Sequence, residues 1–147
     1  RVQAFEEVMK RHPAIKILAS QPANWQRQKA AEVTQNLLTQ FSNTRIDAIW
    51  AADDDMALGA IEAIEAAGAK PGQDIKIVSI DAVKDGMQAL IDGKINYIVE
   101  CNPLLGDLAA GLVKDVLAGK TVEKAIYVED ASFTQEQAAA VIDSRKY

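Results

Sequence analysis

Acidic side chains are the residues of this sequence best suited to chemistry. Asp53, Asp54 and Asp55 stand in a row, and Asp81 follows the apolar run of residues 77–80. A carboxylate can accept hydrogen bonds from two neighbouring hydroxyl groups at once. Aspartate is also a favoured cap at the start of a helix, where the helix dipole suits negative charge. We expect at least one of the three consecutive aspartates to cap a helix, and position alone leaves ligand binding and capping equally open for Asp81.

Catalytic and metal-binding chemistry find little support in the sequence. The only histidine, His12, precedes Pro13 at the predicted end of a helix, where a surface cap is expected. The glycine-rich phosphate and dinucleotide loops and the serine-hydrolase elbow do not occur, and Cys101 has no histidine near it in sequence. No second cluster of oxygen ligands has ion-binding spacing. A hydrolase with Asp53 and Asp81 as paired carboxylates remains an alternative, but we predict a protein that is not an enzyme and uses no metal or cofactor.

The two tryptophans call for different interpretations. Trp25 lies in a loop that follows an apolar run, so its ring could pack on the C–H face of a ligand or could cover the end of a helix. Trp50 lies inside a predicted strand and is expected in the core.

Short β-branched runs alternate with longer stretches of helical spacing along the whole chain. Such alternation predicts an α/β fold with a doubly wound parallel sheet and helices on both faces. Thr134, with an acid or amide in the following turn, is expected to cap the last helix. The strands are expected at residues 15–19, 46–51, 75–80, 95–100 and 125–128, and helices in the segments around residues 30–41, 56–64, 84–91 and 104–116.

The site of an open parallel sheet lies beyond the carboxyl ends of its strands. The residues directly after the predicted strands are therefore the candidates for ligand binding. These residues are 20–25, 53–55, 81–84 and 101–103.

Composition narrows the class of partner. The 147 residues carry a formal net charge of -5 and no basic run, which argues against a nucleic-acid partner. No apolar stretch approaches the roughly 18 residues that span a bilayer. With one cysteine, Cys101, no internal disulfide can form. The chain begins at Arg1 and carries no signal peptide, as a mature or truncated chain would, so targeting signals say nothing of its location.

The segments at the strand ends resemble those of sugar-binding proteins of the ribose-binding type. The likeness runs through the whole chain, and its motifs occur in the family's order. In the family, the matching segments bring an aromatic ring, polar side chains and a final aspartate to the sugar. The matching segments are Ala-Ser-Gln-Pro-Ala-Asn-Trp at residues 19–25, residues 51–60, Ile-Val-Ser-Ile-Asp at residues 77–81, residues 93–103, and Arg1 with Phe5.

The resemblance implies a set of sugar-binding residues and a class of sugar. Asp53 stands where ribose binders usually have asparagine, and Glu-Cys-Asn-Pro at residues 100–103 is more similar to relatives that bind hexoses, including furanose forms. The implied ligand is therefore a monosaccharide, either a pentose or a hexose. The implied binding residues are Arg1, Trp25, Asp53, Asp81 and Cys101.

The resemblance also implies an architecture of two lobes that close on the sugar, in the periplasm, in partnership with the membrane permease of an ABC transporter. Residues 1–102 are then the carboxyl-terminal, ligand-binding lobe. Residues 103–123 hold a helix that belongs to the other lobe, which lies outside this sequence, and residues 124–147 hold the strand that returns through the hinge and the final helix. The alternative is the effector-binding core of a lac-repressor-like transcription regulator, which shares this fold.

Overall fold

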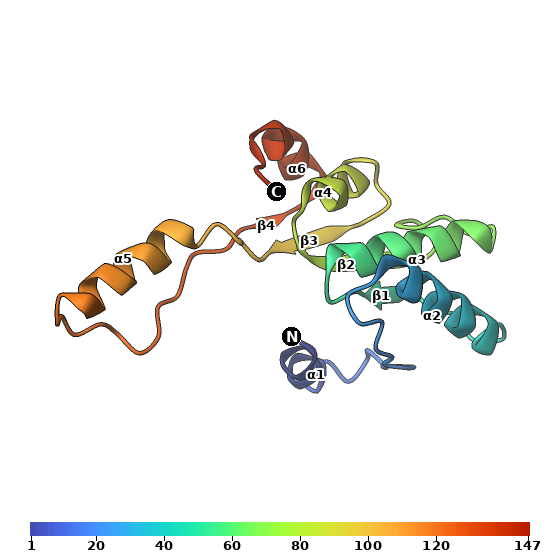
Figure 1. Cartoon of the computed structure of the whole chain (residues 1–147). Coiled ribbons are helices and arrows are strands. Elements are labelled where there is room, and N and C mark those ends of the chain that lie inside the picture. The colour runs from blue at the N-terminus through green and yellow to red at the C-terminus, as the bar shows by residue number, and fades with distance from the viewer.

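The computed structural model describes residues 1–147 and is built around one four-stranded sheet (Figure 1). The strands lie side by side in chain order, and the first three run parallel. The last strand is antiparallel to its neighbour. The predicted parallel α/β sheet is confirmed. The strands are β1 (Ala48–Trp50), β2 (Lys76–Asp81), β3 (Tyr97–Glu100) and β4 (Ser132–Phe133).

Six α-helices and one short 3-10 helix complete the chain. Each of α3 and α4 links one parallel strand to the next, as the alternating pattern predicts. The helices are α1 (Val2–Met9), α2 (Arg27–Gln40), α3 (Asp54–Ala66), α4 (Lys84–Ile91), α5 (Gly106–Leu117), α6 (Gln135–Val141) and η1 (Ile142–Ser144).

The core lies between one face of the sheet and the helices α3, α4 and α6. Ile77 and Ile98 point from the sheet into this layer and are fully buried. Ile64 of α3 and Leu90 of α4 meet them there, also fully buried. Burial of side chains of this size is worth about 1.5–3 kcal/mol each, so this layer holds the fold together.

The opposite face of the sheet is covered by α1 at one corner only. Phe5 stacks on Trp50 with the ring centroids 4.5 Å apart and the planes 12° from parallel. Helices therefore lie on both faces of the sheet, as expected. Trp50 is partly buried, while Val99 on β3 is 39% exposed.

Helices α2 and α3 pack closely because Gly59 has no side chain. A Cβ at this position would lie 2.1 Å from the carbonyl oxygen of Arg27. At the other end of the chain, Thr134 and Gln137 form a capping box at the start of α6, which confirms the predicted cap.

Two predicted strands are absent. Residues 15–19 and 125–128 form no regular structure, although both are rich in β-branched residues. A strand is stable only when its backbone groups pair with a neighbouring strand. Residues 16–22 make no backbone hydrogen bond within this chain, and Ile15 and Tyr127 are 54% and 92% exposed.

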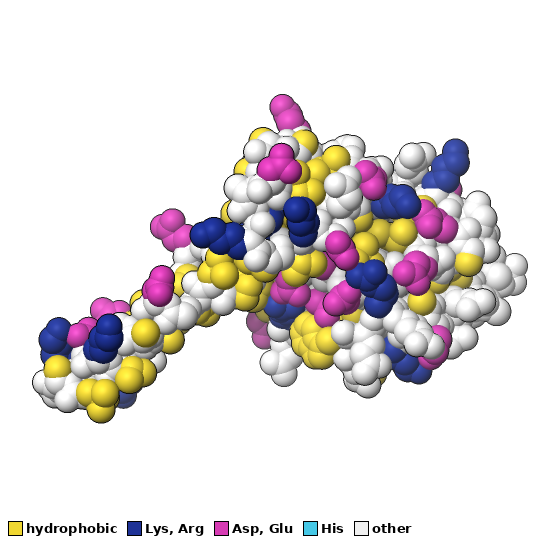
Figure 2. Space-filling view, turned by 45° about the horizontal axis from the view of Figure 1, so that its top comes forward, with side chains coloured by type: hydrophobic (Ala, Val, Ile, Leu, Met, Phe, Trp, Pro, Cys, Tyr) yellow, Lys and Arg dark blue, Asp and Glu magenta, His cyan; other side chains and the backbone are white.

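Helix α5 extends away from the rest of the molecule on two connecting segments (Figure 1). None of its residues is buried, and the space-filling view shows it as a projecting arm (Figure 2). Its exposed apolar residues and those just before it include Leu104, Leu105, Leu108, Val113, Val116 and Leu117. None of the helices in the chain is both long and apolar enough to cross a bilayer.

Candidate ligand-binding site

The residues singled out in the sequence meet at the carboxyl edge of the parallel strands. Asp81 is the last residue of β2, and Cys101 follows β3 directly. The backbone N–H of Cys101 donates to the carbonyl oxygen of Asp81 over 3.3 Å, so the two strand ends are joined. Asp53 follows the end of β1 at the same edge. The topology therefore brings these side chains together, as the rule for parallel sheets predicts.

Arg1 links the site from the amino-terminal side. One guanidinium nitrogen, Nη2, lies 2.6 Å from Oδ1 of Asp81, and the other, Nη1, donates to the carbonyl oxygen of Ala52 over 2.5 Å. The guanidinium carbon lies 5.3 Å from the centroid of the Trp25 ring, within cation–π range. Burial lowers the pKa of Arg1, but the hydrogen bond and charge of Asp81 outweigh burial, and the pKa lies above its usual value. The Cys101 thiol lies near enough to the guanidinium to raise it further.

One carboxylate oxygen of Asp53 makes a hydrogen bond within the chain, and the other makes none. It is the N-cap of α3, and its Oδ1 accepts the backbone N–H of Met56 at 2.6 Å. The expected cap is thus confirmed. Burial raises the pKa of this carboxyl, and the negative charge of Asp81 contributes in the same direction. Its second oxygen has no protein partner and remains an acceptor for a ligand.

Asp81 does not cap the next helix, which resolves the alternatives that its position left open. The N-cap of α4 is Val83, two residues later. Asp81 and Ala82 have φ angles of 121° and 63°, a region that residues with a Cβ rarely adopt. The turn leaves the Asp81 carboxylate at the surface of the site, paired with Arg1.

Trp25 presents its ring rather than burying it. The side chain is 59% exposed, and both Asn24 and Trp25 have positive φ angles, at 54° and 60°. The exposed ring beside a guanidinium is an apolar surface with polar groups next to it, which suits a ligand that has both kinds of surface.

Asp54 was one of the three candidate aspartates, but the sequence did not predict that it is the most buried of the acidic residues. It is 1% exposed, and its carboxylate accepts hydrogen bonds from Ser79 Oγ at 2.6 Å and from the backbone N–H of Val83 at 2.8 Å. Burial raises its pKa to about 6, although these hydrogen bonds act in the opposite direction. A serine inside an otherwise apolar strand was the available signal, because a buried hydroxyl needs a polar partner.

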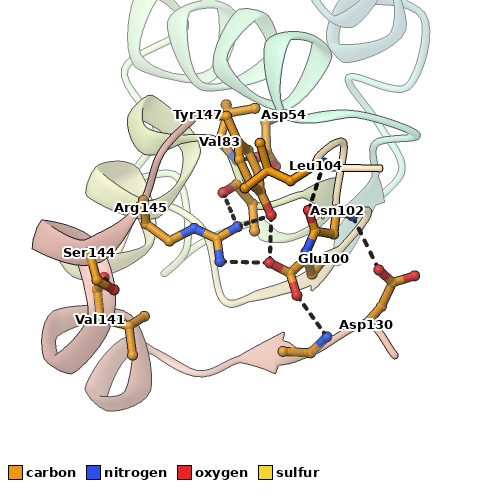
Figure 3. Close-up of polar contacts among 12 residues, drawn as sticks. Asp54, Val83, Glu100, Asn102, Leu104, Asp130, Val141, Ser144, Arg145 and Tyr147 are labelled. Carbon is orange, nitrogen blue, oxygen red and sulfur yellow. Dashed lines mark hydrogen bonds and ion pairs between the residues drawn. The ribbon is translucent and has the colours of Figure 1, made fainter. Parts of the chain in front are cut away.

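A second polar cluster, also missed, joins the chain's end to β3 (Figure 3). Glu100 Oε1 accepts from Arg145 Nη1 at 2.6 Å and from the Tyr147 hydroxyl at 2.5 Å, while Oε2 accepts from the backbone N–H of Ala131 at 3.0 Å. Burial alone raises the pKa of Glu100, but the hydrogen bonds from Tyr147, Ala131 and Arg145 outweigh burial and lower it. Arg145 Nη2 also donates to the carbonyl oxygen of Ala82 at 2.9 Å. The cluster therefore ties both segments that lead to α5 to the turn that carries Asp81.

The site is suited to a small molecule with several hydroxyl groups. Asp53 and Asp81 offer acceptors, Arg1 offers donors, and Trp25 offers an aromatic face. Hydroxyl groups need both kinds of partner, and a ring with C–H groups needs the apolar surface. No group of three or more His, Cys, Asp or Glu side chains is placed to hold a metal ion.

Comparison with known proteins finds a family and several sugar-binding relatives. Residues 1–121 match the family described as "Periplasmic binding protein domain". The fructose import binding protein of Bifidobacterium longum is 43% identical over 88% of the chain. A crystal structure from Mycobacterium smegmatis in complex with β-D-fucofuranose is 50% identical over 97% of the chain, with a TM-score of 0.90. The arabinose-transporter binding component of Shewanella sp. ANA-3, bound to L-arabinofuranose, is 38% identical over 99% of the chain, with a TM-score of 0.92.

The chain spans less than half the length of these relatives, with 39%, 46% and 48% of them covered. The match to the family extends over most of the chain, and the likeness in structure covers nearly all of it. The resemblance found at the strand ends is thus confirmed: the chain belongs to the family of periplasmic binding protein domains, among relatives that bind sugars.

Proposed function

We propose that this chain is the ligand-binding lobe of a two-lobed periplasmic protein that captures a monosaccharide and delivers it to the permease of an ABC transporter. The observation that carries the proposal is the meeting of Arg1, Asp81 and Trp25 at the carboxyl edge of the sheet, with Asp53 beside them. This arrangement supplies a donor, two acceptors and an aromatic face to one ligand. The relatives that match are sugar-binding components of transporters, which supports a receptor rather than an enzyme.

The sugar that we propose is a pentose or hexose in its furanose form. The relatives described above are named for fructose, or were solved with fucofuranose or arabinofuranose. Sugar rings of either size carry hydroxyl groups on adjacent carbons, and the two oxygens of Asp81 can each accept one of them, so the furanose form is proposed from the relatives alone. Cys101 directly follows β3, and its exposed thiol lies close to the guanidinium of Arg1.

The division of the chain that we propose rests on α5, which stands apart from the rest of the molecule (Figure 1) and has no buried residue. Residues 1–102 form the ligand-binding lobe, to which residues 124–147 return with the final helix. Residues 103–123 carry α5, which buries none of its apolar residues in this chain. An amphipathic helix of this kind is stable when its apolar face packs on another element, and the second lobe provides that element.

The test is sugar binding by the complete two-lobed protein, with Asp81→Ala as the variant and Asp47→Ala as its matched control. Asp47 is exposed and precedes β1, at the far end of the sheet from the site. Calorimetry with D-fucose, L-arabinose, D-galactose and D-fructose should find micromolar or tighter binding of at least one. Asp81→Ala should weaken it by about 2–4 kcal/mol, because two sugar hydroxyls lose their acceptor. Equal affinities in Asp81→Ala and the control would refute the role of Asp81.

A further inference from the structure

The turn at Asp81–Ala82 needs support from its surroundings. Both residues have positive φ angles without being glycine, and Ala82 is completely buried. Backbone in this region persists only where neighbouring groups hold it. The turn also sets the direction of the Asp81 carboxylate, which pairs with Arg1 in the site.

Asp54 supports the turn from beneath. Its Oδ2 accepts the backbone N–H of Val83 at 2.8 Å, and its Oδ1 accepts the hydroxyl of Ser79 on β2 at 2.6 Å. One carboxylate therefore holds the chain on both sides of Asp81 and Ala82. The absence of a side chain at Gly86 leaves room for it, since a Cβ there would lie 2.4 Å from Asp54 Oδ2.

The fold does not require a carboxylate at this position for helix formation. Asp53 already caps α3, and Asp54 is its first helical residue. A carboxylate that is 1% exposed is also costly to bury, and apolar side chains often replace buried charges without loss of stability. The cost is justified if Asp54 does something that an apolar side chain cannot, which is to accept two hydrogen bonds around the turn.

We propose that Asp54 is a positioning residue for sugar binding: it fixes the Asp81–Ala82 turn so that the Asp81 carboxylate already faces the site before the sugar arrives. Asp54 itself does not touch the ligand. The inference rests on the proposed function, because it assigns Asp54 a task in the same site. Preorganised acceptors bind more tightly because less freedom is lost on binding.

The experiment compares Asp54→Ala, Asp54→Asn and Ile64→Val in the complete two-lobed protein. Ile64 is a fully buried residue of the same helix, so Ile64→Val is a control for lost stability alone. Asp54→Ala should weaken binding of the tightest of the four sugars named above by about tenfold or more. Asp54→Asn should recover most of the affinity, because an amide can accept from Val83 and donate to the Ser79 oxygen. Ile64→Val should stay within about twofold of wild type while lowering the melting temperature.

Amide exchange and NMR chemical shifts, measured without sugar, report the turn itself. Asp54→Ala should speed exchange of the Val83 amide and shift the Asp81 and Ala82 signals, while those of Ile98 stay in place. If Asp54→Ala does not fold, Ser79→Ala serves instead, because it removes one of the two hydrogen bonds to Asp54. It should cause smaller changes of the same kind in amide exchange and chemical shifts. Wild-type affinity in Asp54→Ala, equal losses in Ile64→Val, or an unchanged turn would overturn the inference. Failure of the wild-type protein to bind any sugar would instead refute the proposed function, and the turn measurements would still decide whether Asp54 holds Asp81 in place.

Discussion

At the scale of single residues, the buried carboxyl group of Asp54 makes stability depend on pH. Burial raises its pKa to about 6 from an ordinary value of 3.8. Between these two values the folded chain holds a proton at Asp54 that the unfolded chain has lost. The free energy of unfolding contributed by Asp54 therefore falls as pH rises from about 4 to about 6, and it levels off above pH 6. A difference of about two pKa units corresponds to about 3 kcal/mol.

Asp54→Asn isolates this contribution, because asparagine does not titrate. We predict that the variant gains stability relative to wild type as pH rises from 4.5 to 7.5, by about 2 kcal/mol, because part of the full effect lies below pH 4.5. Urea unfolding of both proteins over this pH range measures the difference. A difference that stays constant with pH would mean that Asp54 remains ionised throughout.

The sequence predicted the candidate binding residues at the strand ends better than the buried residues that hold those strand ends in place. Asp53 and Asp81 were recognisable because their place after an apolar run puts them at the ligand edge of a parallel sheet. Asp54 was not, since a carboxylate in a row of three is usually exposed. Arg145 could not be found either, because its contact with Glu100 joins residues 45 positions apart. Pairings of that kind depend on tertiary structure alone.

At the scale of elements, the close approach of α2 and α3 depends on one glycine. Gly59→Ala would bring a Cβ to 2.1 Å from the Arg27 carbonyl oxygen, so one helix must move. We predict a loss of about 1–3 kcal/mol in the free energy of unfolding. Gly111→Ala is the matched control, because it also lies within a helix but its Cβ would meet no atom within 4 Å. Urea unfolding should find the control unchanged or slightly more stable, and equal effects at the two positions would contradict the packing argument.

A predicted strand is present in the structure where a neighbouring strand of this chain pairs with it, and absent where there is none. The runs that became β1, β2 and β3 pair with one another. Residues 15–19 and 125–128 are also rich in β-branched residues but pair with no strand of this chain, and they are irregular. Local sequence predicts the tendency to form a strand, whereas the presence of a partner decides whether the strand exists.

At the scale of the whole molecule, the chain exposes more surface than a compact protein of its mass. Its accessible surface is 9869 Å², whereas a compact chain of 15.9 kDa exposes about 7,400 Å². Helix α5 contributes to the excess, since none of its residues is buried and Leu117 is 82% exposed. Apolar surface of this extent promotes association.

We therefore predict that the 147-residue chain alone self-associates and binds sugar weakly, because one lobe leaves half of the ligand in water. Sedimentation velocity with a sugar titration measures both. Val113→Lys combined with Leu117→Lys should shift the chain toward monomer, while Gln40→Lys, on the exposed end of α2, should not. A monomer of 15.9 kDa that binds a monosaccharide at micromolar affinity would contradict this prediction.

The thiol of Cys101 is a natural chemical probe of whether a ligand occupies the site. It is the only thiol in the sequence, it is exposed, and it lies beside Arg1 and Asp81. In the complete two-lobed protein, we expect bound sugar to hinder an alkylating reagent such as iodoacetamide from reaching this thiol. The rate of alkylation, followed by mass spectrometry, therefore reports occupancy of the site without an engineered label. Sugars that bind there should slow the modification as the occupied fraction of the site rises, and a sugar that leaves the rate unchanged at high concentration binds elsewhere or not at all.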